Sequence, residues 1–171
     1  MVQLEAAGED FLARATARSV AEREMAVSAE QLFSTLEDAN SWSQFFPIIR
    51  HVEWTSPRPF GTGTTRTVTL VGGVTLEEVF WTWEPGRRMG FAITASSTRA
   101  LKGLVETYDI TPLSDRRCKL RWQMAMKLNG PLRFIERYMG ASLLRTQARL
   151  LKRCERVAQG WSPKSGQSTP E

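Results

Sequence analysis

The stretch PLRFIERYMGASLLRTQARLLKRCERVAQ, residues 131–159, predicts one long C-terminal helix, and the rest of the chain is interpreted around it. It follows Asn129-Gly130, and Pro is favoured in a first helical turn because its missing N–H would have no partner there. At 1.5 Å per residue, this helix would be roughly 40 Å long. One stripe at helical spacing is mainly apolar and consists of Leu132, Ile135, Met139, Leu143, Thr146, Leu150 and Val157. We therefore expect the helix to lie across an apolar surface of similar length.

The other side of the predicted helix is basic. Residues 130–159 hold seven basic and two acidic side chains, a balance that equals the net charge of +5 of the whole chain. Such a face is either an ordinary solvated surface or a site of weak contact with an anionic membrane. Only Phe134 and Tyr138 interleave aromatic rings with the basic side chains, so no nucleic-acid partner is expected.

Length and composition indicate one soluble domain. The chain has 171 residues, of which 42% are hydrophobic and 24% charged. No segment approaches the roughly 20 apolar residues of a membrane span, and acidic residues at Glu5, Glu9 and Asp10 argue against a signal peptide. Cys118 and Cys154 have no metal or redox spacing and are interpreted as buried, inert thiols. These features predict a cytoplasmic protein without a metal or other cofactor, and they leave its oligomeric state open.

The pattern along the chain predicts an N-terminal extension (1–15), one folded domain (16–159) and a disordered polar tail (160–171). The domain begins with a strand over 17–27. Ser28-Ala29-Glu30-Gln31 is a capping box that starts a short helix ending near Asp38, and a second short helix follows over 41–46 after a break at Ala39-Asn40. Six more strands are predicted, over 48–56, 64–71, 74–84, 87–96, 104–113 and 116–128.

This order predicts an α+β fold. Strands joined by short turns form an antiparallel sheet, and seven of them curl strongly. The last strand alternates between apolar and polar residues, as a sheet with one buried face requires. The long helix would then fill the concave side of a seven-stranded sheet, with the two short helices placed after the first strand.

Three sequence motifs, in this order, resemble those of the SRPBCC or START-like helix-grip superfamily. They are EREMAVSAEQLFSTLEDANSWSQFFP (22–47), FGTGT (60–64) and EVFWTWEPGRRM (78–89). The likeness covers about residues 18–158 and is strongest to the polyketide cyclase/dehydrase-like branch. It implies a cavity between the sheet and the long helix that binds a hydrophobic ligand. Some members of the superfamily cyclise or dehydrate polyketides and others only carry ligands, and no catalytic motif is shared by all of them.

Strand alternation and the helical stripe together predict the side chains that line this cavity. The same residues could instead pack a solid core, because Met and aromatic side chains at these spacings are core residues by default. The predicted lining is Val68, Leu70, Phe80, Met89, Phe91, Ile93, Trp122, Met124 and Met126 from the strands, and Ile135, Met139 and Leu143 from the helix.

Four polar side chains are candidates for chemistry in the cavity. Glu106 and Tyr108 share a strand face, and if that face is inward, burial would raise the pKa of the carboxyl group and suit it to general acid–base catalysis. Arg66 could bind a ligand carboxylate or bend to solvent, and His51 could point inward or away. Three hypotheses follow: binding or carriage of a hydrophobic small molecule, a cofactor-free cyclase or dehydratase in the same cavity, and a module that contacts a membrane or a partner through the basic helix face.

Overall fold

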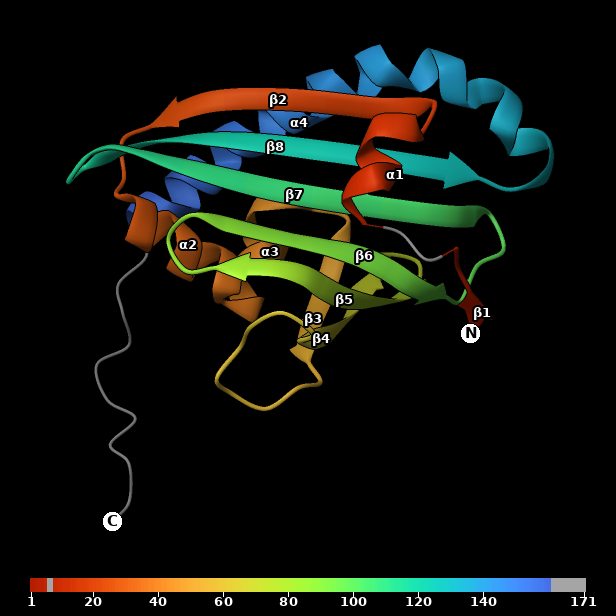
Figure 1. Ribbon diagram of the computed structural model, residues 1–171, viewed down its shortest axis with the longest axis horizontal. Helices are drawn as coiled ribbons and strands as arrows, with labels where there is room; N and C mark the ends of the chain where they lie inside the picture. Colours follow the sequence, from red (N-terminus) through yellow and green to blue (C-terminus); the bar gives the residue numbers. More distant parts are fainter. Residues whose placement is uncertain (6–7, 161–171) are drawn as a thin grey trace.

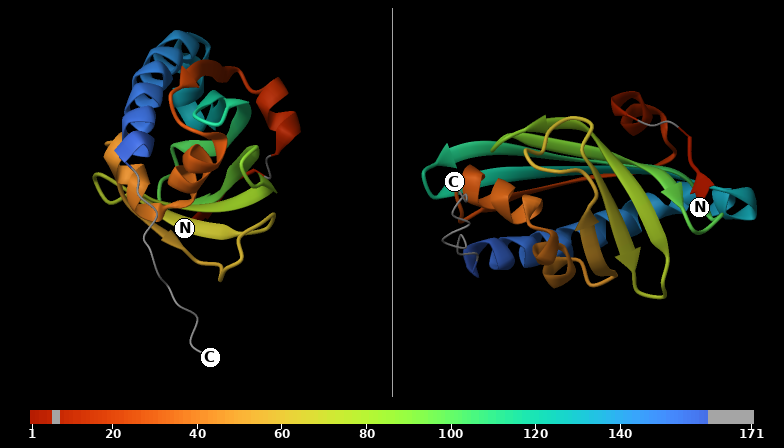
Figure 2. Two further views of the ribbon diagram at one scale, coloured as in Figure 1. Left: turned by 90° about the vertical axis from the view of Figure 1, so that its left-hand side faces the viewer. Right: turned by 90° about the horizontal axis from the view of Figure 1, so that it is seen from below.

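The computed structural model describes residues 1–5 and 8–160, and it confirms the α+β helix-grip architecture (Figure 1). Seven strands form one antiparallel sheet in the order β2-β8-β7-β6-β5-β4-β3. Their bounds are β2 Ala17–Met25, β3 Ile49–Trp54, β4 Thr65–Leu70, β5 Thr75–Glu84, β6 Arg88–Ser96, β7 Leu101–Ser114 and β8 Arg117–Leu128. The sheet curves, and the long helix crosses its concave side (Figure 2). Of the predicted tail, only Gly160 falls within the described residues.

Two short helices, α2 (Ala29–Glu37) and α3 (Ala39–Phe45), follow β2 as predicted. Ser28 caps α2, with its hydroxyl oxygen accepting a hydrogen bond from the Gln31 N–H at 3.1 Å. The expected break at Ala39-Asn40 was wrong, because Asp38 ends α2 and at the same time caps α3 by accepting from the Asn40 N–H at 3.1 Å. One carboxylate therefore lets the second helix begin two residues earlier than predicted.

The N-terminal extension carries more structure than the sequence indicated. Strand β1 (Val2–Gln3) pairs with β6 and adds an eighth strand to the sheet, and helix α1 (Glu9–Arg14) packs on β7. Gly103 on β7 provides the contact site, because a Cβ atom there would come within 2.9 Å of the Phe11 ring. A glycine at this position thus allows α1 to approach the sheet closely.

The C-terminal helix is shorter than predicted and is rotated relative to the predicted stripe. Residues Gly130–Ile135 form the 3-10 segment η1, and α4 begins at Glu136 and ends at Gly160. Leu132 and Ile135 are 42% and 49% exposed, because η1 extends past the end of the sheet and has no strand to cover (Figures 1 and 2). The buried residues of α4 are Glu136, Gln147, Leu150, Leu151, Cys154 and Ala158. No helix among the described residues is both long enough and apolar enough to cross a membrane.

Both cysteines are free and buried, as predicted. Burial raises the pKa of the Cys118 thiol to about 11 and that of Cys154 to about 12. Neither thiol is therefore ionised near neutral pH, which makes both unreactive.

Candidate functional site

A cavity of about 300 Å³ lies between the concave face of the sheet and the middle of α4. Its wall is almost entirely apolar. Two exposed residues on the wall, Ile48 before β3 and Thr146 on α4, mark where it reaches the surface. The lining residues are Trp42, Phe46, Ile48, Ile49, Val68, Leu70, Leu76, Glu78, Ile93, Leu104, Glu106, Tyr108, Trp122, Met124, Met126, Leu143, Thr146, Gln147 and Leu150.

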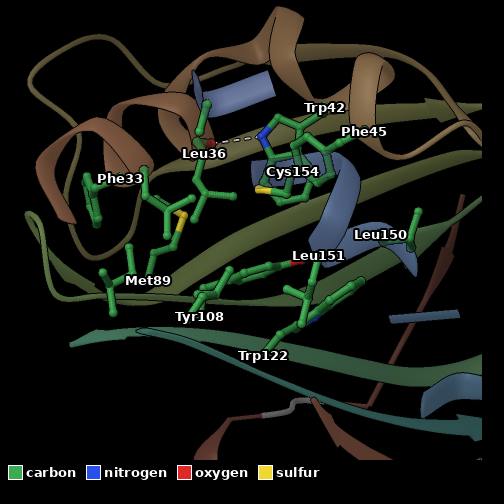
Figure 3. Close-up of a cluster of buried hydrophobic side chains, with 14 of the residues drawn as sticks. Phe33, Leu36, Trp42, Phe45, Met89, Tyr108, Trp122, Leu150, Leu151 and Cys154 are labelled. Carbon is green, nitrogen blue, oxygen red and sulfur yellow. Dashed lines mark hydrogen bonds between the residues drawn. The ribbon is translucent and has the colours of Figure 1, made fainter. Parts of the chain in front are cut away.

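The opposite end of the same sheet face is filled with side chains, so the cavity occupies only part of the concave side. Phe80 packs against Trp54 and Trp83 with ring centroids 5.2 and 5.0 Å apart, and Phe33 of α2 meets Trp83 at 5.5 Å. Met89 is completely buried in this region (Figure 3). Helix α2 lies over this end of the strands, and its side chains fill the space beneath it. The corresponding space under α4 remains open.

A buried ion pair stands between the filled end and the cavity. Arg66 of β4 and Glu78 of β5 face each other across the strand ladder, and Arg66 Nε lies 2.5 Å from Glu78 Oε2. Both side chains are almost fully buried, and the guanidinium group lies over the rings of Trp42 and Phe91 at 4.1 and 4.6 Å. Burial raises the pKa of Glu78, and the Arg66 charge partly opposes that rise. Only Glu78 of this pair reaches the cavity wall.

A second buried carboxyl group, Glu106 of β7, accepts two hydrogen bonds from side chains on the cavity wall. The Tyr108 hydroxyl donates to Glu106 Oε2 at 2.5 Å, and the Trp122 indole N–H donates to the same oxygen at 3.0 Å. Burial raises the pKa of Glu106 to about 7, with the nearby Glu78 charge acting in the same direction and the two hydrogen bonds opposing it. Burial also raises the pKa of Tyr108 well above its usual value. Glu106 is thus poised to exchange a proton near neutral pH.

Gln147 contributes the buried polar group of the α4 side of the cavity. Its side chain is 1% exposed, and its amide nitrogen donates to the Trp122 carbonyl at 3.4 Å. Because a carbonyl oxygen can only accept, this contact fixes which end of the amide faces β8. The amide oxygen, Oε1, is buried and has no hydrogen-bond partner.

Seven of the twelve apolar residues predicted to line the cavity do so: Val68, Leu70, Ile93, Trp122, Met124, Met126 and Leu143. Phe80, Met89 and Phe91 are on the predicted face but belong to its filled end. Ile135 and Met139 also lie off the wall, which the helix meets only from Leu143 onward.

Of the polar candidates, Glu106 and Tyr108 face the cavity and touch each other. His51 is exposed and lies outside the cavity, because the alternation of β3 turns its neighbour Val52 inward instead. Arg66 does point inward, but Glu78 and the aromatic rings hold it behind the wall. The expectation that it could bend to solvent was wrong.

Sequence reasoning missed two groups of lining residues. Trp42, Phe46, Ile48 and Ile49 come from α3 and the segment after it, whose position over the sheet has no periodic signal. The other missed residues are Leu76, Leu104 and Leu150, which are apolar, and Glu78, Thr146 and Gln147, which are polar. Glu78 had a usable signal, because it lies two residues before Phe80 and therefore shares the strand face that was predicted to be inward.

Two further hollows on the described part of the chain are surface sites of a different kind. One of about 590 Å³ is bounded by Asp38, Gln44, Arg153 and Arg156, among others, and one of about 730 Å³ lies beside α1. Polar and charged side chains line both. Across residues 1–5 and 8–160, no group of three His, Cys, Asp or Glu side chains is arranged to hold a metal ion.

Comparisons with known proteins agree with this architecture. The model of a family described as "Polyketide cyclase / dehydrase and lipid transport" matches residues 16–159. Uncharacterised proteins of Mycobacterium tuberculosis and Mycobacterium bovis are 44% identical over 110 residues, a match that spans 64% of this chain and 65% of each relative. Among solved structures, a START superfamily protein from Mycobacterium smegmatis has a TM-score of 0.68 at 14% identity and covers 84% of this chain and 99% of its own. The Zhui aromatase/cyclase from a Streptomyces species has a TM-score of 0.67 at 13% identity, with 83% and 93% of the two chains covered. At these identities the structural likeness shows the fold.

Proposed function

We propose, from the premise that the chain belongs to the polyketide cyclase/dehydrase and lipid transport family, that it binds or carries a hydrophobic small molecule between the sheet and α4. The family and the fold support a role in hydrophobic-ligand binding or cyclisation. The observation that favours binding is the cavity itself, about 300 Å³ in volume and almost wholly apolar. Ligand sites range from about 300 to 1,000 Å³, so a small ligand fits.

Flexible apolar side chains on the cavity wall also favour binding. Met124 and Met126 of β8 and Leu143 of α4 meet the cavity from two sides. Thioether side chains adapt to ligands of irregular shape, because they are unbranched and rotate freely. A wall of this kind can pack tightly against an apolar ligand without requiring one particular ligand shape.

Native mass spectrometry tests this proposal directly. The protein is stripped of bound lipid by reversed-phase extraction and refolding, and is then titrated with fatty alcohols, sterols and aromatic polyketides. We expect a one-to-one complex with at least one class, accompanied by a change in tryptophan fluorescence because Trp42 and Trp122 line the cavity. If no apolar compound is retained at any concentration, the proposed function is wrong.

The second candidate, a cyclase or dehydratase, is favoured by the Glu106–Tyr108 contact. A carboxyl group with a pKa of about 7 can remove a proton from a ligand carbon or return one to a departing hydroxyl group. The Tyr108 hydroxyl, which donates to that carboxylate, would hold it in position.

Turnover of a β-hydroxyketone or poly-β-ketone substrate tests this candidate. Glu106→Gln should remove turnover and leave binding in place, and Tyr108→Phe should lower turnover and shift its pH profile, because Glu106 loses a hydrogen bond. Equal turnover by both variants and the unchanged protein would exclude Glu106 as the acid or base.

A further inference from the structure

The hydrogen-bond donors on the cavity wall are already used within the protein. The Trp42 indole N–H donates to the Leu36 carbonyl at 2.8 Å, and the Trp122 N–H and the Tyr108 hydroxyl both donate to Glu106. Thr146, the other lining hydroxyl, lies at the exposed mouth. A ligand that brings only acceptors, such as a ketone or an ether, would therefore find few free donors on the buried wall.

In contrast to the donors, one hydrogen-bond acceptor on the wall has no partner within the protein. Gln147 Oε1 is buried without a donor, and an unpartnered buried acceptor is costly unless something satisfies it. Glu78 and Glu106 add carboxyl groups to the same wall. The buried wall thus lacks donors rather than acceptors.

The charge of the wall disfavours an anionic ligand. None of the lining residues is a cation, and Arg66 is paired with Glu78 and covered by the Trp42 and Phe91 rings. Its Nη1 atom has no hydrogen-bond partner, but Arg66 lies behind the lining residues rather than among them. A carboxylate in the cavity would face two carboxyl groups without a cation of its own.

We propose that the cavity selects a neutral ligand with an apolar body and a hydroxyl donor, an alcohol or a phenol, whose O–H group binds Gln147 Oε1. This inference rests on the proposed function and specifies its ligand class. A hydroxyl group also accepts, so it remains compatible with Glu106 in either protonation state.

Three matched probes test the proposal: 2-naphthol, naphthalene and 2-naphthoate, which share one ring system and differ in the polar group. Isothermal titration at pH 8 should rank 2-naphthol first, about tenfold tighter than naphthalene because one buried acceptor gains a partner, and 2-naphthoate last. If 2-naphthoate binds most tightly, or if 2-naphthol and naphthalene bind equally, the selectivity proposal is wrong while the binding proposal stands. If none of the three binds but a larger apolar compound does, the ranking is repeated on the alcohol, the hydrocarbon and the carboxylate of that compound.

The Gln147→Leu variant assigns the effect to this residue. It should remove the preference for 2-naphthol over naphthalene and keep naphthalene binding. Gln123→Leu on β8 is the control, because Gln123 is partly buried but does not line the cavity. A preference that persists in Gln147→Leu would contradict the assignment, and the ranking of the probes on the unchanged protein decides the proposal even if this variant does not fold.

A separate observation concerns the outer surface where η1 meets α4, which we call the tip surface. It consists of the exposed apolar residues Leu132, Phe134, Ile135, Tyr138 and Leu144 and the exposed basic residues Arg133, Arg137, Arg145 and Arg149. Phe134 and Tyr138 are 63% and 68% exposed. The segment between the end of β8 and the start of α4, which carries part of this surface, extends beyond β8 in Figure 1.

The residues of the tip surface on α4 share one helix face. Arg137, Tyr138, Leu144, Arg145 and Arg149 are all exposed and follow helical spacing. No acidic residue occurs between Arg137 and Cys154. Exposed rings and leucines flanked by arginines fit an anionic bilayer, which offers both an apolar phase and negative charge.

We infer that the tip surface docks on an anionic lipid bilayer. Vesicles of phosphatidylcholine, with and without phosphatidylglycerol, test this by co-sedimentation. Binding should require phosphatidylglycerol and weaken in high salt. Arg137→Glu with Arg145→Glu should lower the vesicle partition by more than about tenfold. Phe134→Ser with Tyr138→Ser should remove the part of the vesicle binding that persists in high salt.

Leu113→Ser with Val20→Ser is the control, because both residues are exposed and apolar but lie elsewhere. If this pair lowers binding as much as the tip variants do, the surface is misassigned. Binding to a DNA duplex but not to vesicles, or a mass that doubles with concentration and is restored to the monomer by Phe134→Ser, would replace the bilayer with another partner.

Discussion

The two ends of the concave sheet face are built from the same strands and have opposite packing. On β6, Met89 and Phe91 lie in the filled end and Ile93 lines the cavity. On β5, Phe80 belongs to the filled end and Leu76 to the cavity wall. What differs is the covering element, which is α2 over the filled end and α4 over the cavity. Strand alternation therefore decides which face is buried, whereas the covering helices decide whether that face is solid or hollow.

The boundary between the two ends is polar. The Arg66–Glu78 pair on β4 and β5 and the Glu106–Tyr108–Trp122 group on β7 and β8 lie on either side of β6. Close packing on one side and a cavity on the other place these groups away from water but next to a ligand site.

The largest effect is expected at the buried ion pair. Arg66→Met leaves the Glu78 carboxylate buried without a partner, and we expect the free energy of unfolding at pH 8 to fall by about 3–5 kcal/mol. Guanidinium denaturation measures this fall in the free energy of unfolding. The double variant Arg66→Met with Glu78→Leu removes both charges and should recover most of the loss. A double variant no more stable than the single one would show that the pair is not the cause.

The same substitution at the two ends of the sheet should have unequal costs. Met89→Ala in the filled end leaves a void in a close-packed region, and we expect it to destabilise the protein by about 2–5 kcal/mol. Met126→Ala enlarges an existing cavity beside a partly buried side chain and should cost about 1 kcal/mol. Urea denaturation of both variants measures the two losses in the free energy of unfolding. Equal losses would mean that the cavity end is packed as tightly as the filled end.

At the boundary, Glu106 should make stability depend on pH. Its pKa is about 7 in the folded protein against 4.5 in the unfolded chain, so the folded state binds more protons within this interval. The stability that this proton confers is fully present below pH 4.5 and is lost as the pH rises through 7, a decrease of about 3 kcal/mol by pH 8.

Glu106→Gln lacks this ionisation and should be more stable than the unchanged protein at pH 8 by about 2–3 kcal/mol, with the two converging near pH 5. Denaturation at both pH values measures the difference. Glu77→Gln on the exposed side of β5 is the control and should follow the unchanged protein. A Glu106→Gln curve parallel to that of the unchanged protein would exclude a raised pKa.

The sequence predicted the face of each side chain better than its surroundings. The two-residue period of a strand placed Glu106 and Tyr108 on one face correctly, because it depends only on local backbone geometry, but it left open whether that face is inward. The alternation could not show that Phe80 lies in the filled end and Leu70 on the cavity wall, because this difference depends on where α2 and α4 cross the sheet. Those positions follow from contacts between distant segments. The 3-10 turn of η1 was missed for a related reason, because the apolar spacing of Leu132 and Ile135 fits a helix even though no strand lies beneath them.

The smallest effect on stability should accompany the largest effect on binding. Leu143 of α4 is partly buried and lines the cavity, so a larger side chain at this position has free volume to enter. We expect Leu143→Phe to change the free energy of unfolding by less than about 1 kcal/mol, whereas an oversized side chain in a packed core costs about 1–3 kcal/mol. The same change should lower the affinity for any ligand in the cavity by at least about tenfold, because the ring occupies the ligand's space. Ile110→Phe, at a buried position of β7 outside the cavity, is the matched control and should show the reverse pattern of lost stability with no direct effect on the cavity. If Leu143→Phe destabilised the protein as much as Ile110→Phe and left binding unchanged, the space beneath α4 would be packed rather than open.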